Sequence, residues 1–140
     1  VISNDNYGIR IEKENLLSKR GGFWGNIPSV IFCGRAHSTP NGAYIDICNS
    51  FDGKIPRIYR ASTGHVAFEL PSEWSVYNIN KDTCIIILTG VMKYGTSVNQ
   101  TNPVYASVTN FEYFSSDISI AITQNNTLVD GTFYFELKRI

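Results

Sequence analysis

The side chains best able to do chemistry in this 140-residue chain are two histidines, three cysteines and a few carboxylates. Cys33 and His37 are four residues apart, which invites a thiol–imidazole pair. Cys33 falls in an apolar, strand-like run, however, and no nearby carboxylate or amide stands out to orient the imidazole. His65 and Glu69 have the same spacing, but in a strand it separates two side chains by about 13 Å, too far for one metal ion to bridge. We therefore expect no nucleophilic dyad, no metal site and no cofactor.

Glycoside hydrolysis would require a pair of carboxylates, and the candidates are Asp46, Glu69 and Glu73. Nothing in the sequence singles out two of them as a pair. No glycine-rich loop has the spacing of a dinucleotide-binding or phosphate-binding motif. We expect a binding protein and not an enzyme, with a small glycan hydrolase as an alternative.

Groups suited to binding sugars are plentiful. Aromatic rings stack on sugar faces, while arginine, carboxylate and imidazole groups hydrogen-bond to hydroxyls or to a phosphodiester. Trp74 follows a polar turn at residues 71–73, where ligand-contacting residues tend to lie. We expect Trp74 to contact a ligand, although large rings in β-sandwiches more often belong to the core. The other candidates of these kinds are Trp24, Tyr44, Tyr59, Tyr77, Arg35, Arg57, Asp46 and His65.

The charge and apolar patterns argue against two classes of partner. Twelve basic and twelve acidic residues give a net charge of zero, so phosphate-driven binding to nucleic acid is not expected. The longest purely apolar run, Cys84 to Leu88, is far too short to insert across a bilayer. The three cysteines lie in or beside apolar runs, which predicts buried free thiols and folding in a reducing cytoplasm.

Short alternating or β-branched runs separated by turn residues predict strands. The sequence TPNG at residues 39–42 indicates a hairpin, because proline presets one turn dihedral and Asn-Gly supplies positive φ. In the next strand, alternation places Ile45 and Ile47 on one face and Tyr44 and Asp46 on the other. The most apolar segment, residues 83–92, is expected to be a central strand. The expected strands are residues 30–35, 43–48, 55–60, 65–70, 83–92, 104–108, 117–123 and 132–138.

About eight such strands, with no stretch of helical periodicity, predict an all-β antiparallel sandwich or barrel of Greek-key or jelly-roll type. The first twenty residues differ, because they hold seven charges and end at a glycine pair. This shift predicts a boundary near residue 22, between an N-terminal segment (1–22) and a main domain (23–140). The few apolar residues of the segment cannot bury themselves alone. They would pack with copies of the same segment in a threefold stalk, or form an arm that is disordered or lies on the domain.

Three features support a family resemblance: the sequence YGIRI at residues 7–11, the GGFW junction at residues 21–24, and a β-rich remainder with GTFYF at residues 131–135. In these features the chain resembles the neck-plus-head fragment of receptor-binding proteins from tailed bacteriophages, most closely those of lactococcal siphophages. The resemblance covers essentially the whole chain.

The resemblance implies a homotrimer at the tip of a phage baseplate, folded in the bacterial cytoplasm and then carried in the virion. Residues 1–22 would form an interlaced β neck, and residues 23–140 a β-barrel head that binds saccharides or phosphosaccharides of the host cell wall. Because the chain begins at Val1 without Met, we expect upstream domains that contact other baseplate proteins. Binding crevices in such heads lie between protomers and use Trp, His, Asp and Arg. The ligand-binding residues that we select on this basis are Arg35, His37, Asp46, Arg57, His65 and Trp74.

Other functions stay open at this point. A trimeric jelly-roll ligand of the C1q or tumour-necrosis-factor type would bind a protein receptor, and its usual signs are secretion and often a disulfide. A glycan hydrolase would use an Asp/Glu pair. A structural baseplate or capsid decoration would keep its aromatic residues in the core.

Overall fold

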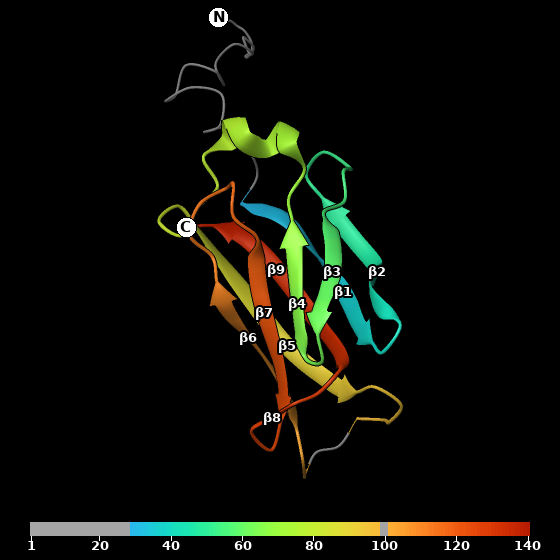
Figure 1. Ribbon diagram of the computed structural model, residues 1–140. Coiled ribbons are helices and arrows are strands. Elements are labelled where there is room, and N and C mark those ends of the chain that lie inside the picture. The colour runs from blue at the N-terminus through green and yellow to red at the C-terminus, as the bar shows by residue number, and fades with distance from the viewer. Residues whose placement is uncertain (1–28, 99–100) are drawn as a thin grey trace, which may run out of the picture.

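The computed structural model describes residues 29–98 and 101–140, and in these ranges the chain is built almost entirely of strands (Figure 1). A single short 3-10 helix, η2 (Ser72–Tyr77), interrupts the strands in the described part of the chain. The strands are β1 (Val30–Thr39), β2 (Gly42–Ser50), β3 (Arg57–Ser62), β4 (His65–Glu69), β5 (Cys84–Lys93), β6 (Val104–Asn110), β7 (Ile118–Gln124), β8 (Thr127–Leu128) and β9 (Gly131–Arg139). All eight strands expected from the sequence are present, with ends that differ by a few residues.

The strands form two antiparallel sheets that pack face to face as a sandwich. Sheet A has the order β2-β1-β9-β5, and sheet B has the order β3-β4-β7-β6 with β8 paired to β7. The chain changes sheets between β2 and β3, between β4 and β5, between β5 and β6, and between β8 and β9. In chain order, the β4–β7 pair of sheet B therefore falls inside the β1–β9 pair of sheet A. The prediction of an all-β antiparallel sandwich is confirmed.

Aromatic rings fill the core between the sheets. Phe68 of sheet B lies edge-on to Phe32 and Phe135 of sheet A, with ring centroids 5.7 and 4.9 Å apart. Such pairs add to the roughly 1.5–3 kcal/mol that full burial of a large apolar side chain contributes. Three isoleucines of β7, at positions 118, 120 and 122, cover the sheet B side of the core. The alternating pattern of β7 thus has its expected meaning, with one face inward.

The structure corrects the predicted position of the most apolar strand. β5 lies at the edge of sheet A, hydrogen-bonded to β9 on one side only, and not at its centre. Apolar residues on both faces of a strand are typical of central strands, which is why the sequence pattern misled. The predicted neck, residues 1–22, lies outside the described residues.

Candidate functional site

The candidate site lies on the outer face of sheet A, where β2 carries a β-bulge. Arg35 of β1 pairs with Ile47, and the next residue, Ala36, pairs with Ile45, so Asp46 is an extra residue in β2. A bulge of this kind turns two neighbouring side chains to the same face. Ile45 packs against the core while Ile47 is half-exposed, so the expectation that these two isoleucines share a face is wrong. The bulge directs Asp46 outward, next to β1.

Asp46 and Arg35 form a forked ion pair. Arg35 Nη2 donates to Asp46 Oδ2 at 2.7 Å, and Arg35 Nε lies 3.2 Å from both carboxylate oxygens. The hydrogen bonds from Arg35, assisted by His37, hold the pKa of Asp46 well below its usual range, although partial burial acts in the opposite direction. Asp46 is therefore an ionised acceptor at neutral pH.

His37 is fixed on three sides in the same cluster. Its Nε2 lies 3.0 Å from Asp46 Oδ2, its Nδ1 lies 2.8 Å from Thr132 Oγ1, and its ring stacks on Tyr44 at 4.8 Å. Because an ionised carboxylate only accepts hydrogen bonds, Nε2 carries a hydrogen and its N–H donates a hydrogen bond to Asp46. In the neutral ring, Nδ1 then accepts a hydrogen bond from the Thr132 hydroxyl. We call Arg35, His37 and Asp46 the Asp46 cluster.

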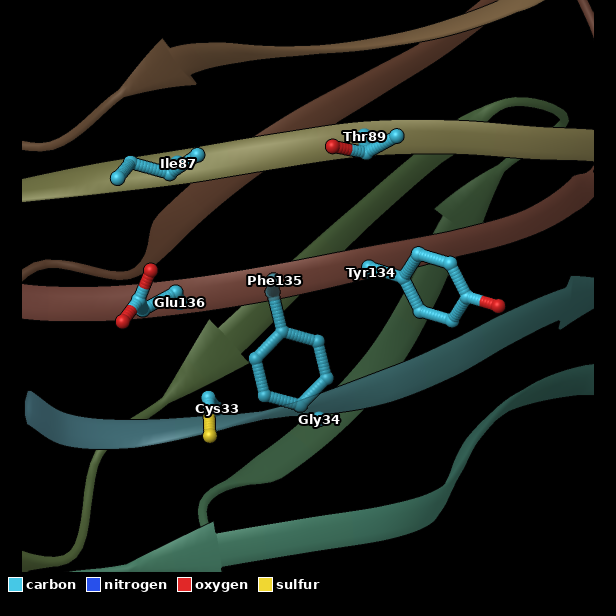
Figure 2. Close-up of a pocket in the computed structure, with 7 residues that line it drawn as sticks. All are labelled: Cys33, Gly34, Ile87, Thr89, Tyr134, Phe135 and Glu136. Atoms are coloured by element: carbon cyan, nitrogen blue, oxygen red, sulfur yellow. The ribbon is translucent and has the colours of Figure 1, made fainter.

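An open hollow of about 410 Å³ lies on β1, β9 and β5 of the same sheet, and Figure 2 shows the residues that line it. Tyr134 connects the hollow to the cluster, because it belongs to the wall of the hollow and lies opposite Arg35 in the pairing of β1 with β9. The volume falls within the range of small-molecule sites. The lining residues are Cys33, Gly34, Ile87, Thr89, Tyr134, Phe135 and Glu136.

Two further selected residues lie on the opposite sheet. Arg57 and His65 are on β3 and β4 of sheet B, and their side chains face outward, because Val66 and Phe68 of β4 face the core. Arg57 Nη1 pairs with Glu69 Oε1 at 2.6 Å, with both side chains largely exposed. Sheet A and sheet B meet through their inner faces, so Arg57 and His65 do not join the Asp46 cluster.

Trp74 corrects another expectation. It lies in η2, between strands as predicted, but its side chain is 0% exposed and packs against Phe51 and Phe32. Its indole Nε1 donates to Asp52 Oδ2 at 2.7 Å, which satisfies the one polar group of the ring. The turn was predictable, but the direction of the side chain was not, and Trp74 has no face open to a ligand in this structure.

Sequence reasoning did not select Asp130, although this carboxylate makes the densest buried polar contacts near the site. It accepts hydrogen bonds from Ser38 Oγ at 2.8 Å, from Arg60 Nη2 at 2.9 Å and from the Gly64 amide at 3.2 Å. Its partners lie on β1, on β3 and in the β3–β4 turn, so no short sequence motif could reveal them. Asp130 connects the two sheets and has a structural role.

Asp46 lies on the outer face of sheet A and Glu69 on that of sheet B, so these two do not form a carboxylate pair. Among the described residues, no group of three or more His, Cys, Asp or Glu side chains could hold a metal ion. None of the three cysteines is in a disulfide. In the same part of the chain, no helix has the length and apolarity required to cross a membrane.

Comparison with known proteins adds no relative to this description. No protein-family model, no curated protein and no solved structure matches the chain.

Proposed function

We propose that this chain is the neck and head of a phage adhesin, whose head binds saccharides or phosphosaccharides of the host cell wall. The observation that supports this function is the Asp46 cluster. Three of the six residues selected by type, Arg35, His37 and Asp46, meet on one outward-facing surface beside an open hollow.

The cluster offers the groups that recognise a sugar or a phosphodiester. A guanidinium has five N–H donors, and Arg35 uses only Nε and Nη2 toward Asp46, so it retains donors for a hydroxyl or a phosphate oxygen. Tyr44 and Tyr134 flank it with half-exposed rings on which a sugar can stack. The hydrogen bonds within the cluster hold these groups in place before binding, which lowers the entropy lost on complex formation.

A shallow site of this kind binds weakly by itself, and the proposal includes the homotrimer for that reason. Three heads on one neck, with many trimers on one baseplate, multiply the avidity by orders of magnitude without any new contact. The interlaced neck is proposed for residues 1–22. If it holds the trimer, light scattering should show three copies of the 15.7 kDa chain for the full protein, and a mass falling toward one shortened chain when residues 1–20 are deleted. A full chain that is already monomeric would contradict the neck.

The saccharide site is tested by two matched arginine variants. Binding of the full chain is measured to cell-wall polysaccharides purified from a panel of lactococcal strains, and to the corresponding whole cells. Arg35→Ala should reduce binding at least tenfold, because it removes the donors and leaves Asp46 with His37 as its remaining partner in the cluster. Arg57→Ala removes an exposed arginine from the opposite sheet and should bind like the wild type. Equal binding by both variants, or no binding of the wild type to any strain, would refute the proposed site.

A further inference from the structure

A second hollow lies at one end of the sandwich. It has a volume of about 340 Å³, which falls within the range of small-molecule sites. Sheet A contributes the end of β5, while sheet B contributes β8 and the β3–β4 turn, and Figure 1 shows all three at the same end of the molecule. None of its lining residues belongs to the Asp46 cluster or to the hollow on the outer face of sheet A. The residues that line it include Thr63, Lys93, Tyr94, Leu128 and Asp130.

Asp130 and its partners form a fixed wall of this hollow. The Asp130 side chain is buried, and Arg60 of β3 binds its carboxylate through a two-pronged ion pair. The Gly64 amide donates to the same carboxylate at 3.2 Å, and the Tyr94 amide donates to the Asp130 carbonyl oxygen at 2.8 Å. These bonds hold the wall in one arrangement before any ligand arrives, which lowers the entropy lost on binding.

The charges at the hollow leave one positive group over. Arg60 Nη2 lies 2.9 Å from Asp130 Oδ2, so the two charges of this pair compensate each other. Lys93 takes part in none of the ion pairs formed by the described residues, and its ammonium group therefore has no counter-charge in that part of the chain. The hollow accordingly favours a ligand that carries an anionic group.

Thr63 adds a second donor from the other sheet. Arg60 Nη2 donates to Thr63 Oγ1 at 2.9 Å. Because a guanidinium only donates, the Thr63 hydroxyl is the acceptor in this bond and keeps its own hydrogen for another acceptor. Thr63 and Lys93 are thus two separate donors, which suit a phosphate with oxygens on several sides. A planar carboxylate is matched best by the fork of an arginine, and the Arg60 fork is already taken by Asp130.

Apolar surface lies beside these two donors. Tyr94 and Leu128 line the hollow and are 51% and 40% exposed. A half-exposed tyrosine ring offers a flat face for stacking and a hydroxyl for hydrogen bonding. The hollow therefore suits a ligand in which a ring with a partly apolar face carries a phosphate, and a sugar phosphate has both parts.

The geometry points to a sugar-phosphate site at this end of the sandwich, with the phosphate on Lys93 and Thr63 and the sugar against Tyr94. This site goes beyond the proposed function, because it uses no residue of the Asp46 cluster and requires neither the trimer nor a host cell. The same phosphate chemistry occurs in a free sugar phosphate and in the phosphate groups that link sugars in a wall polysaccharide.

Amide NMR spectra of the full chain, labelled with nitrogen-15, test the site with glucose 1-phosphate as the probe. The probe should shift the amide signals of Thr63, Gly64, Lys93 and Tyr94. Glucose lacks the charge and should need roughly tenfold more, or higher, concentrations for the same shifts. A purified phosphate-linked wall polysaccharide distinguishes the two sources. If it shifts the same amides, the site takes the phosphate of a glycan, and if only glucose 1-phosphate does so, the site takes a free sugar phosphate.

Matched lysine variants complete the test. Lys93→Ala should raise the dissociation constant for glucose 1-phosphate by roughly tenfold or more, because it removes the charge and three donors. Lys54→Ala removes an exposed lysine from the β2–β3 loop and should bind like the wild type. Thr63→Val keeps a β-branched side chain without the hydroxyl, and it should also weaken binding if Lys93→Ala fails to fold.

Two results would overturn the site. One is an unchanged spectrum at the four named amides when glucose 1-phosphate is added. The other is a folded Lys93→Ala variant that binds the probe as tightly as Lys54→Ala. Each amide reports on its own surroundings, so signals from Arg35 and Asp46 show separately whether the proposed saccharide site is occupied. Failure of one site is therefore distinguishable from failure of the other.

Discussion

Arg60 and Asp130, 70 positions apart in the sequence, form a two-pronged ion pair in which Nε and Nη2 of Arg60 lie 3.0 and 2.9 Å from the two carboxylate oxygens. Asp130 is only 8% exposed and also accepts a hydrogen bond from Ser38 of sheet A, whereas Arg60 belongs to sheet B. The carboxylate therefore connects the two sheets directly. Because a buried charge that loses its partner is strongly unfavourable, this pair should be sensitive to substitution.

Asp130→Asn should lower the free energy of unfolding by about 3 kcal/mol, because it leaves the Arg60 guanidinium without its counter-charge. Urea denaturation of the full chain measures the difference. Glu69→Gln is the control, since it breaks the exposed pair with Arg57 and should cost less than about 1 kcal/mol. Equal losses of unfolding free energy in the two variants would show that the buried ion pair of Asp130 is no more stabilising than the exposed pair of Glu69.

Acid should destabilise the protein through the same carboxylate. Burial alone would raise the pKa of Asp130, but hydrogen bonds from Arg60, Ser38 and the Gly64 amide outweigh it and lower that pKa. A lowered folded pKa contributes stability that is fully present above the unfolded value of about 3.9 and is lost as the pH falls through the folded pKa. Urea denaturation at a series of acidic pH values should show this loss in the wild type. The decline should be shallower in Asp130→Asn, and an identical decline would contradict the assignment.

Trp74 should prove to be a stability residue. Trp74→Ala is expected to lower the free energy of unfolding by about 3–5 kcal/mol, because removal of the indole leaves a cavity beside Phe51 and Phe32. Trp74→Phe keeps much of the volume but leaves Asp52 without its indole donor, so its cost should be smaller. A folded Trp74→Phe variant should keep saccharide binding. Loss of binding as complete as in Arg35→Ala would contradict a purely structural role for Trp74.

The three thiols should react in a fixed order. Burial and the neighbouring Cys33 raise the pKa of Cys48 to about 11, so at about pH 8 only roughly one Cys48 in a thousand is ionised. Cys84 is buried, whereas Cys33 lines the open hollow on sheet A. Iodoacetamide, followed by mass spectrometry at low protein concentration, should modify Cys33 first and Cys84 last. Cys33→Ser should remove the fast phase, and a fast phase that persists would contradict this order.

Most of the fold follows from local sequence signals. Alternation and turn residues locate the strands, and the Asn125–Asn126 turn between β7 and β8 shows why, because both residues have positive φ, which asparagine tolerates. β5 was misplaced because apolarity on both faces shows that a strand should be covered, without showing whether the same chain covers it. The sequence pattern shows that both faces of β5 suit a covered strand. Only the strand order shows that the described residues leave one face of β5 uncovered.

The candidate site was predictable only in part. The hairpin between β1 and β2 brings Arg35 and His37 opposite residues 44–47, but the bulge decides that Asp46 faces them. An extra residue in a ladder has no sequence signature here. Arg57 and His65 have the same chemical types, yet the chain changes sheets between β2 and β3, which sends them to the other side of the sandwich. Residue type selected the candidates, and topology separated them.

The bulge at Asp46 also makes the surface chemistry of sheet A depend on the length of one strand. Residues 45 and 47 already pair with consecutive residues of β1, so loss of the single codon for Asp46 would restore regular alternation and leave the other pairs of the hairpin in place. The same deletion would remove Asp46, the only acidic side chain that pairs with Arg35 and His37 among the described residues, and so turn this end of the face cationic. One genetic step would thus change the charge of this surface without a compensating change in the core.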